Sequence, residues 1–354
     1  MDAILLVGGQ GTRLRPLTIS APKPMLPTAG VPFTAHQLAR AKAAGIDHVV
    51  LATSYQAEVF EAHFGDGSAF GLELEYVTEV LPLGTGGGIR NVADRLRSED
   101  VVVLNGDVLD GHDIAAQVAM HRKTGAAVTL YLTRVDDPRA FGCVPVDEDG
   151  RVTAFLEKDP DPVTNLVNAG CYVFRRQTLL EIPAGEVVSV ERQTFPGLLA
   201  AGDLLHGFID DGYWLDLGTP AAFVRGSCDL VLGRVSSPAL PGPTGEWLLL
   251  PGAQVAGDAK LSGGTTVGAG ASVGAGARVH GSVVFDGAQV AAGAHVVDSV
   301  IGRDASIGAG TVLRGVVIGD RAVIGAGNEL LAGARVFPGA VLGDGAVRFS
   351  SDRS

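Results

Sequence analysis

A glycine-rich stretch near the N-terminus, GGQGTRLRPLT over residues 8–18, combines a permissive backbone with positive charge. Glycine allows the backbone to approach a ligand closely, and successive N–H groups can face phosphate oxygens. Three cationic side chains belong to the same region: Arg13, Arg15 and Lys23. The stretch follows the apolar residues 3–7, which read as a buried parallel strand. Glycines and cations after such a strand predict a nucleoside triphosphate site.

Spacing excludes two common phosphate-binding loops. A Walker A loop needs Lys-Ser or Lys-Thr directly after its second glycine, and no such pair follows here. A dinucleotide fingerprint needs a third glycine where this chain has Leu14. The remaining pattern, GxGTRLxPLT followed by Lys23-Pro24, resembles the sugar-phosphate nucleotidylyltransferase family, and most of all its mannose-1-phosphate guanylyltransferase branch. The resemblance assigns nucleotide binding to Gly8, Gly9, Gly11, Thr12, Arg13 and Lys23.

Two carboxylates are candidates for holding a metal ion. Residues 101–105 read as a buried strand that runs into Gly106 and Asp107, and Asp216 lies in the string WLDLG. Both resemble family motifs whose aspartates hold Mg²⁺, an ion that prefers carboxylate, phosphate and water oxygens. The alternatives are a turn cap at Asp107 and a helix cap at Asp216, ahead of the helix expected from Pro220.

Further motifs resemble the sugar-binding elements of the family. Glu157-Lys158 ends a predicted strand, and in the family this Lys meets the sugar phosphate while the Glu meets a sugar hydroxyl. The alternative is a solvated ion pair, and Asp159 stands where the family usually continues Lys-Pro. The resemblance assigns the sugar 1-phosphate to Asn105, Gly106, Gly142, Glu157, Lys158 and Asn168.

Glu79 is the residue expected to read the nucleotide base, because it stands four positions before Leu83-Gly84-Thr85. An ionised carboxylate only accepts hydrogen bonds, and guanine presents two adjacent donors that a carboxylate can accept together. Adenine presents no such pair, so Glu79 favours GTP. Guanylyl relatives often carry a further acid where this chain has Leu81, and a surface glutamate at a strand end is the alternative interpretation. Gly84 and Thr85 are assigned to the nucleotide by resemblance.

The resemblance implies transfer of a nucleotidyl group from GTP to a sugar 1-phosphate, best matched by mannose 1-phosphate, with release of pyrophosphate. Arg13 and Lys23 would hold the triphosphate, Lys158 would hold the sugar phosphate, and Mg²⁺ would bridge the two substrates. The attacking phosphate oxygen is already ionised at neutral pH. Catalysis therefore needs in-line alignment and charge neutralisation rather than a general base.

Other functions stay open. The same motifs suit another hexose or cyclitol 1-phosphate, including a pseudo-sugar of secondary metabolism, or another nucleoside triphosphate. A sugar acyltransferase would need a general base in the tail, where His280 and His295 are the histidines. A non-catalytic regulatory subunit is expected to have lost the phosphate loop or the metal acids, which this chain retains.

The apolar pattern predicts the elements that position these side chains. Strands and helices alternate before residue 236, which predicts an α/β fold with a doubly wound, Rossmann-like mixed sheet. Predicted strands are 3–7, 48–53, 72–77, 101–105, 127–135, 152–158 and 171–174, and predicted helices are 33–44, 85–96, 114–124 and 220–232. Ligands of such sheets bind at the carboxyl ends of strands, where residues 8–13 and Asp107 fall. Residues 236–246, rich in Pro, Gly and Ser, read as a linker after a catalytic domain of residues 1–235.

Residues 247–354 are predicted to form a parallel β-helix of hexapeptide repeats, which by family resemblance is left-handed. Aliphatic residues recur about every six positions with Gly or Ala following, a period that neither an α-helix nor an alternating strand produces. Three such positions per turn give roughly five coils. The expected inward positions are Val255, Leu261, Val267, Val273, Val279, Phe285, Val290, Val296, Ile301, Ile307, Leu313, Ile318, Ile324, Leu330, Val336 and Leu342. Flat faces and open coil ends favour a homo-oligomer formed through this domain.

The composition excludes several classes of partner. A formal net charge of -12 argues against nucleic acid and anionic membranes, and no apolar run approaches the ~18 residues of a membrane span. Three cysteines without C-x-x-C spacing, and no basic and apolar leader, predict a reduced cytoplasmic protein. The histidines lack zinc-ligand spacing, so Mg²⁺ is the expected cofactor.

Overall fold

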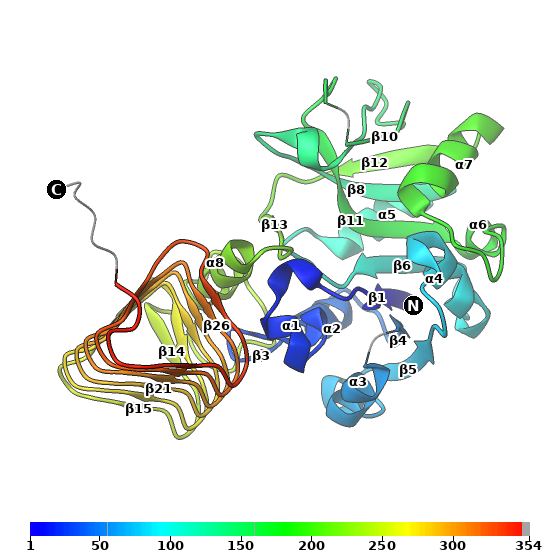
Figure 1. Cartoon of the computed structure of the whole chain (residues 1–354). Helices are drawn as coiled ribbons and strands as arrows, with labels where there is room; N and C mark the ends of the chain where they lie inside the picture. Colours follow the sequence, from blue (N-terminus) through cyan, green and yellow to red (C-terminus); the bar gives the residue numbers. More distant parts are fainter. Residues whose placement is uncertain (55, 159, 349–354) are drawn as a thin grey trace. The chain divides into compact units, whose positions relative to one another are not determined.

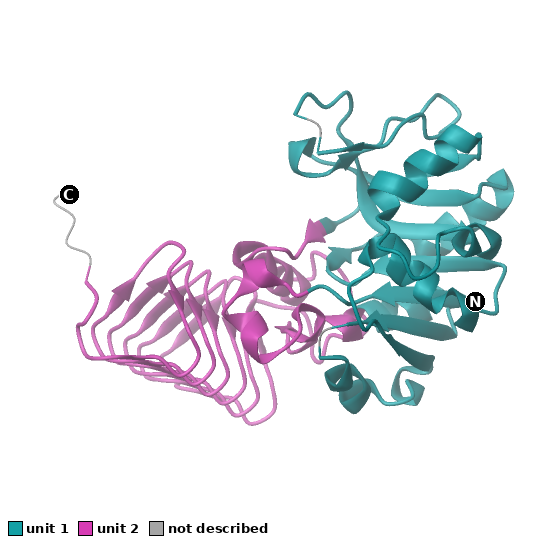
Figure 2. Cartoon of the chain, turned by 45° about the vertical axis from the view of Figure 1, so that its right-hand side comes forward, with its two compact units in different colours: residues 1–9, 37–214 teal, residues 10–36, 215–354 magenta. Residues whose placement is uncertain are grey.

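The chain divides into two compact units, each assembled from two stretches of sequence (Figure 2). The first unit comprises Met1–Gly9 and Gln37–Trp214, and the second comprises Gln10–His36 and Leu215–Ser354. The computed structural model describes residues 1–54, 56–158 and 160–348. Residues 10–36, which include most of the candidate phosphate loop, belong with the C-terminal tail in this division. Independent folding of residues 1–235 stays a prediction.

A nine-stranded mixed sheet forms the centre of the first unit (Figure 1). Its strands are β1 (Asp2–Leu6), β4 (His48–Thr53), β5 (Glu73–Thr78), β6 (Asp100–Asn105), β8 (Val128–Arg134), β9 (Gly142–Cys143), β10 (Leu156–Glu157), β11 (Leu166–Arg175) and β12 (Leu205–Ile209). The run β6-β1-β4-β5 is parallel, whereas β11 pairs antiparallel with β6 and β8. The central strands are buried along almost their whole length, which explains their continuous apolar sequences. The predicted doubly wound mixed sheet is confirmed.

Helices alternate with these strands. They are α2 (Phe33–Ala43), α3 (Ala57–Phe64), α4 (Gly84–Val92), α5 (Ile114–Thr124), α6 (Arg176–Leu180) and α7 (Phe195–Ala201), with the single turns η3 (Ser68–Phe70), η4 (Ala93–Arg95), η5 (Pro138–Ala140) and η6 (Val190–Thr194). The capping of α5 is local: Asp113 Oδ1 accepts from Ala116 N at 2.9 Å, and Gly125 ends the helix in the left-handed conformation. None of the helices in the described part of the chain is long and apolar enough to cross a membrane.

One predicted strand of the first unit is much shorter than expected. Residues 152–158 contribute only β10 and an isolated bridge from Val152 to Val146, and Arg151 just before them forms an isolated bridge with His206. The short strands β7 (Val108–Asp110) and β13 (Trp214–Asp216), the helices α3, α6 and α7, and the strand β12 were not expected. Each is short, and brief segments carry too few residues for a periodic signal.

A parallel β-helix forms most of the second unit, as the hexapeptide pattern predicts (Figure 1). We call its three sheets the covered sheet, the open sheet and the third sheet. The covered sheet contains β14 (Trp247–Leu249), β17 (Thr265–Val267), β20 (Val283–Val284), β23 (Val300–Ile301), β26 (Val317–Ile318) and β29 (Arg335–Val336). The open sheet contains β15 (Gln254–Val255), β18 (Ser272–Val273), β21 (Gln289–Val290), β24 (Ser306–Ile307), β27 (Val323–Ile324) and β30 (Val341–Leu342). The third sheet contains β16 (Lys260–Ser262), β19 (Arg278–His280), β22 (His295–Val297), β25 (Val312–Arg314) and β28 (Glu329–Leu330).

The interior of the β-helix differs from the expected repeat at one position. Val284, rather than Phe285, belongs to the aliphatic interior, because the five-residue step falls between Val279 and Val284, one repeat earlier than predicted. Phe285 packs instead in a second cluster outside the coils, where its ring meets the Phe223 ring edge-on at 6.4 Å. The other expected inward positions line the interior.

The outer face of the covered sheet is buried by the rest of its own unit. Val283, Val300 and Val317 are at most 3% exposed, although they point away from the interior. Residues 10–36 form the short elements η1 (Thr12–Leu14), α1 (Leu17–Ser20), η2 (Lys23–Met25), β2 (Pro27–Thr28) and β3 (Val31–Pro32). The later part of the second unit adds the helix α8 (Pro220–Val231). The cluster around the three valines contains Leu14, Leu17, Leu26, Phe223, Val224, Cys228 and Phe285. The candidate phosphate loop and α8 therefore share one apolar core with the β-helix.

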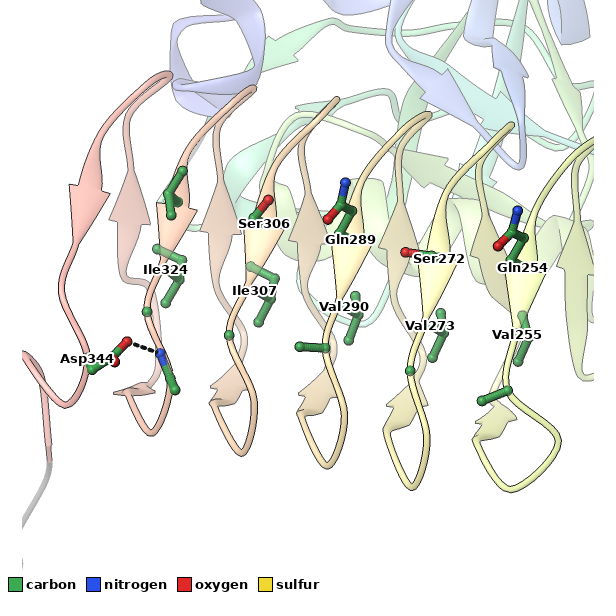
Figure 3. A pocket seen from close by; sticks show the side chains of 17 residues that line it. Gln254, Val255, Ser272, Val273, Gln289, Val290, Ser306, Ile307, Ile324 and Asp344 are labelled. Carbon is green, nitrogen blue, oxygen red and sulfur yellow. Dashed lines mark hydrogen bonds between the residues drawn. The ribbon is translucent and has the colours of Figure 1, made fainter.

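The outer face of the open sheet is a shallow groove of about 800 Å³ (Figure 3). Its outward row alternates small and amide side chains: Gln254, Ser272, Gln289 and Ser306. Val323 and Val341 continue the row and are 41% and 71% exposed. Among the described residues of the second unit, only residues of the β-helix itself line this groove.

Candidate active site

Two predicted triphosphate ligands and one predicted metal ligand cluster in the second unit. Lys23 Nζ lies 3.8 Å from Asp216 Oδ1, and Arg13 Nη2 lies 4.0 Å from Asp216 Oδ2. Lys23 has only 10% of its side chain exposed, whereas Arg13 is 67% exposed. A Cβ on Gly218 would approach Arg13 Nη2 to 2.5 Å, so the last glycine of WLDLG leaves room for the guanidinium. The structure thus joins the first motif of the chain to one more than 200 residues later.

The turn that presents Arg13 depends on Gly11. Gly11 has φ 59, and a Cβ at this position would also come within 2.8 Å of the Lys23 Cβ. Its carbonyl accepts from Leu14 N at 2.9 Å and from Thr18 Oγ1 at 3.0 Å. Thr12 begins η1 beside it and is exposed. The glycine lets the Arg13 turn pack directly on the Lys23 stem.

Asp216 does not cap the helix that follows it. The N-cap of α8 is Thr219, whose hydroxyl accepts from Ala222 N at 3.2 Å. The helix-cap interpretation of Asp216 is therefore wrong, and its carboxylate faces Arg13 and Lys23 instead. The role of Asp216 as a metal ligand stays a prediction.

In the first unit, Gly8 and Asp107 follow the carboxyl ends of the neighbouring parallel strands β1 and β6. Gly106 N donates to Leu6 O at 2.9 Å, which ties the two strand ends together. Ser54 Oγ donates to Gly8 O, and the following Gly9 is exposed. This edge is where ligands of parallel sheets bind.

The turn around Asp107 is held by a buried glutamine that sequence reasoning missed. Gln37 Nε2, from α2, donates to the carbonyl oxygens of Asn105 and Val108 at 3.3 and 2.7 Å. One turn further along α2, Arg40 Nη2 donates to the buried Asp110 carboxylate. Neither contact has a local sequence signal, because both depend on α2 packing against β6 and β7.

Asn168 lies at an irregularity in β11. The register between β11 and β8 shifts between Asn168 and Tyr172, which marks a bulge. Within it, Asn168 Nδ2 donates to the Tyr172 hydroxyl at 2.8 Å, and Gly170 N donates to Asn168 Oδ1 at 3.2 Å. Gly170 leaves room for Asn105, whose Nδ2 would lie 2.8 Å from a Cβ there. The structure thus brings Asn105 beside the bulge that carries Asn168.

Gly142, Glu157 and Lys158 come together where β9 pairs with β10. Glu157 stands opposite Gly142, and Lys158 N donates to Phe141 O at 3.1 Å. Lys158 adopts φ 55, which is uncommon for a residue other than glycine, and its Nζ lies 3.7 Å from Glu157 Oε1. Its side chain is 60% exposed. Asp159, where the sequence departs from the family pattern, lies outside the described residues.

Glu79, Gly84 and Thr85 lie at the start of α4. Glu79 Oε2 accepts from Leu83 N at 3.2 Å, and burial raises the pKa of the Glu79 carboxyl above its ordinary value. The Thr85 hydroxyl donates to Glu191 Oε2 at 2.9 Å and accepts from Val190 N at 3.0 Å. Gly84 begins the helix. Thr85 thus helps to anchor this segment, a role that the resemblance did not suggest.

Comparisons with known proteins cover both parts of the chain. A sequence model of the family described as "Nucleotidyl transferase" matches residues 2–231, and one described as "GMPPB C-terminal domain" matches residues 244–343. A mannose-1-phosphate guanylyltransferase of Mycobacterium tuberculosis is 60% identical over 99% of this chain and 98% of its own length. The mannose-1-phosphate guanylyltransferase catalytic subunit beta of Drosophila pseudoobscura is 38% identical over 72% of this chain and 70% of its own length.

Solved structures show the same sheet fold. A putative glucose-1-phosphate thymidylyltransferase from Bacillus anthracis superposes with a TM-score of 0.59 at 24% identity, covering 64% of this chain and 94% of its own. HddC from Yersinia pseudotuberculosis, complexed with GMP-PN, gives 0.55 at 24% identity, covering 64% and 97%. The resemblance noted from the phosphate loop is confirmed by the family match and by the full-length relative. The chain belongs to the nucleotidyl transferase family.

Proposed function

We propose that the chain joins GTP and mannose 1-phosphate to give GDP-mannose and pyrophosphate. The observation that carries the chemistry is the cluster of Arg13 and Lys23 around Asp216. Two cations beside a carboxylate suit a triphosphate that binds with a divalent cation. The specificity is supported by the Mycobacterium tuberculosis guanylyltransferase, which is 60% identical across both the sheet and the β-helix.

The residues of each unit have different tasks in this proposal. Arg13 and Lys23 hold the triphosphate and stabilise the charge that passes to the departing pyrophosphate, and Lys158 holds the sugar phosphate in line with the α-phosphorus. Asn168, Glu157 and Asn105 offer amide and carboxylate groups to sugar hydroxyls, and the backbone at Gly106 and Gly142 lies beside the sugar. The attacking oxygen comes from the substrate, so no side chain is required as nucleophile or general base.

The chemistry of the proposed donors suits Mg²⁺. Asp107 in the first unit and Asp216 in the second each offer a hard carboxylate, and this ion commonly takes one or two carboxylates from protein when phosphates and water complete its shell. When bound, the ion would supply positive charge that neutralises phosphate oxygens. The task of this chain is to present the two carboxylates: Gln37 fixes the turn before and after Asp107, and the Thr219 cap leaves Asp216 outside α8.

Glu79 is proposed to read guanine. Its Oε2 accepts from Leu83 N, so the carboxylate is fixed at the start of α4 and has acceptor capacity left. Further nucleotide contacts are proposed through backbone N–H groups at Gly8, Gly9 and Gly84 of the first unit and at Gly11 and Thr12 of the second. Thr85 contributes mainly by its bond to Glu191, which anchors the segment after Glu79.

A substrate matrix tests the proposal. GTP, ATP, UTP and dTTP are each paired with the 1-phosphates of mannose, glucose, galactose and a cyclitol, and pyrophosphate release is followed. The highest kcat/KM is expected for GTP with mannose 1-phosphate. A higher kcat/KM with another sugar or cyclitol phosphate would mean that mannose 1-phosphate is not the preferred acceptor. A higher kcat/KM with another triphosphate would contradict the assignment of guanine as the base. The same preparation in light scattering tests the proposed homo-oligomer, for which a monomeric mass would be contrary evidence.

A further inference from the structure

Arg335, at the far end of the β-helix, contacts the turn that carries Arg13. Its Nη1 donates to the Arg15 carbonyl oxygen at 2.8 Å, across 320 residues of sequence. We propose that Arg335 is a positioning residue for the triphosphate loop: it touches no substrate and fixes the turn that presents Arg13. This inference rests on the proposed function, because it assigns the Arg13 turn to the triphosphate.

The acceptor of this bond is the end of a short helix. Arg15 is the C-cap of η1, and its own N–H bonds to Thr12 O. The last carbonyls of a helix have no partner within it, and an arginine side chain is well suited to them by charge and by its several N–H donors. Gly11 thus stands at the start of this turn, and Arg335 binds the carbonyl group at its end.

The position of Arg335 in the covered sheet explains why it is an arginine. The outward positions of this sheet stand in register: Val283 pairs with Val300, Val300 with Val317, and Val317 with Arg335. The three valines are buried under Leu14, Leu17 and α8, whereas Arg335 is exposed. At the last coil the outward row of the covered sheet thus ends in an arginine, which hydrogen-bonds to the segment on which the valines pack. In the covered sheet, the three valines pack against the segment that carries Arg13, and Arg335 donates a hydrogen bond to the same segment.

Because Arg335 is exposed, its removal should not unfold the chain. Arg335→Gln should lower kcat/KM for GTP about three- to tenfold, as expected for the loss of one charge-assisted hydrogen bond at a partly exposed site. The KM for mannose 1-phosphate and the thermal unfolding midpoint should stay at the wild-type values. Arg335→Lys keeps a cationic donor and should recover part of the loss.

The matched control is Arg278→Gln, which removes an exposed arginine from the third sheet. Hydrogen exchange of residues 11–18 gives a readout that does not depend on activity. Faster exchange of these amides in Arg335→Gln, and not in Arg278→Gln, supports the inference. Equal exchange and equal GTP kinetics in the two variants would overturn it while leaving the proposed function intact. A wild-type chain that is inactive with GTP and mannose 1-phosphate would overturn the proposed function, and the exchange experiment would still decide the role of Arg335.

Discussion

The two units carry candidate residues of different chemical character. In the second unit Arg13 and Lys23 each lie within 4.0 Å of Asp216, and the segment that carries them shares a core with the β-helix. In the first unit most candidates are amides, backbone groups or single carboxylates at strand ends, supported by the core of the mixed sheet. The triphosphate cations thus stand on one core, whereas most candidates for substrate recognition stand on the other, together with Asp107 and Lys158. Substitution of Arg13 or Lys23 should therefore affect turnover, and substitution of Glu79 should affect substrate selection.

The largest effect is expected where charge is removed from the metal ligands. Asp107→Asn and Asp216→Asn should each lower kcat at least about a thousandfold, or ~4 kcal/mol, because an amide is a poor ligand for a hard cation. Pyrophosphate release across a Mg²⁺ titration measures the loss. The control is Asp211→Asn, which breaks only an exposed ion pair with Arg134. Wild-type turnover by either metal-ligand variant would exclude that aspartate from the site.

The packing of the β-helix against the segment that carries Arg13 and Lys23 should be nearly as sensitive to substitution. Phe285→Ala removes a ring that packs on Phe223 and should lower the free energy of unfolding by about 3 kcal/mol. Denaturant titration measures this loss, and GTP turnover should fall with it. The control is Ser306→Ala, in the outward row of the open sheet (Figure 3), which should change stability by less than ~0.5 kcal/mol. Equal losses of stability in the two variants would show that packing on the covered sheet contributes no more to stability than the outward row of the open sheet.

The triphosphate cations come next. Lys23→Ala and Arg13→Ala should each lower kcat about a hundredfold, because they stabilise charge that grows on the leaving pyrophosphate. Steady-state kinetics with saturating mannose 1-phosphate give kcat and KM for GTP separately. Arg139→Ala, which removes an exposed arginine paired with Asp137, is the control. A rise in KM with unchanged kcat would mean that the cations only bind.

The smallest expected effect is on selection of the base by the first unit. Glu79→Gln should reduce the preference for GTP over ATP, UTP and dTTP at least tenfold, about 1.4 kcal/mol, since one guanine N–H would then face an N–H. The ratio of kcat/KM values with mannose 1-phosphate as the fixed partner measures this preference. An unaltered ranking would show that Glu79 only anchors Leu83.

The raised pKa of Glu79 adds a pH dependence. Burial favours its protonated form, so the preference for GTP should weaken on acidification at a higher pH than the ordinary glutamate value of about 4.3. The folded state holds this proton more tightly than the unfolded chain, so the stability that the proton contributes is lost as pH rises through the folded pKa. Glu79→Gln should abolish the pH dependence of the preference. A pH-independent preference in the wild type would contradict guanine reading by this carboxylate.

Much of the fold could be predicted because its signals are local. The five- and six-residue steps between aliphatic residues mark the β-helix, and the cap and terminal glycine of α5 mark its ends. The placement of residues 10–36 could not be predicted in this way, because their packing on the covered sheet joins positions hundreds of residues apart. One signal was present: the positions before the inward residues are valine at Val283, Val300 and Val317, but Ser or Gln in the open sheet. An apolar outward row in a β-helix indicates a covered face.

The site residues stay a prediction, although the structure brings three of them, Arg13, Lys23 and Asp216, together. Short motifs suggested them, because the motifs can be recognised in the sequence without knowledge of the packing. Their supports were missed: Gln37 beside Asp107, Glu191 beside Thr85, and Arg335 beside Arg15. Each support is a single polar side chain whose partner is fixed only by tertiary packing, so no spacing in the sequence indicates it.

The most direct test of the proposed guanylyl transfer follows the α-phosphate. The wild-type chain is incubated with Mg²⁺, mannose 1-phosphate and GTP labelled at the α-phosphorus, and the products are separated. In-line attack at the α-phosphorus predicts that all transferred label is in GDP-mannose, with none in pyrophosphate and none on the denatured chain. Label on the chain would indicate a covalent intermediate, and the absence of labelled GDP-mannose would contradict guanylyl transfer to mannose 1-phosphate.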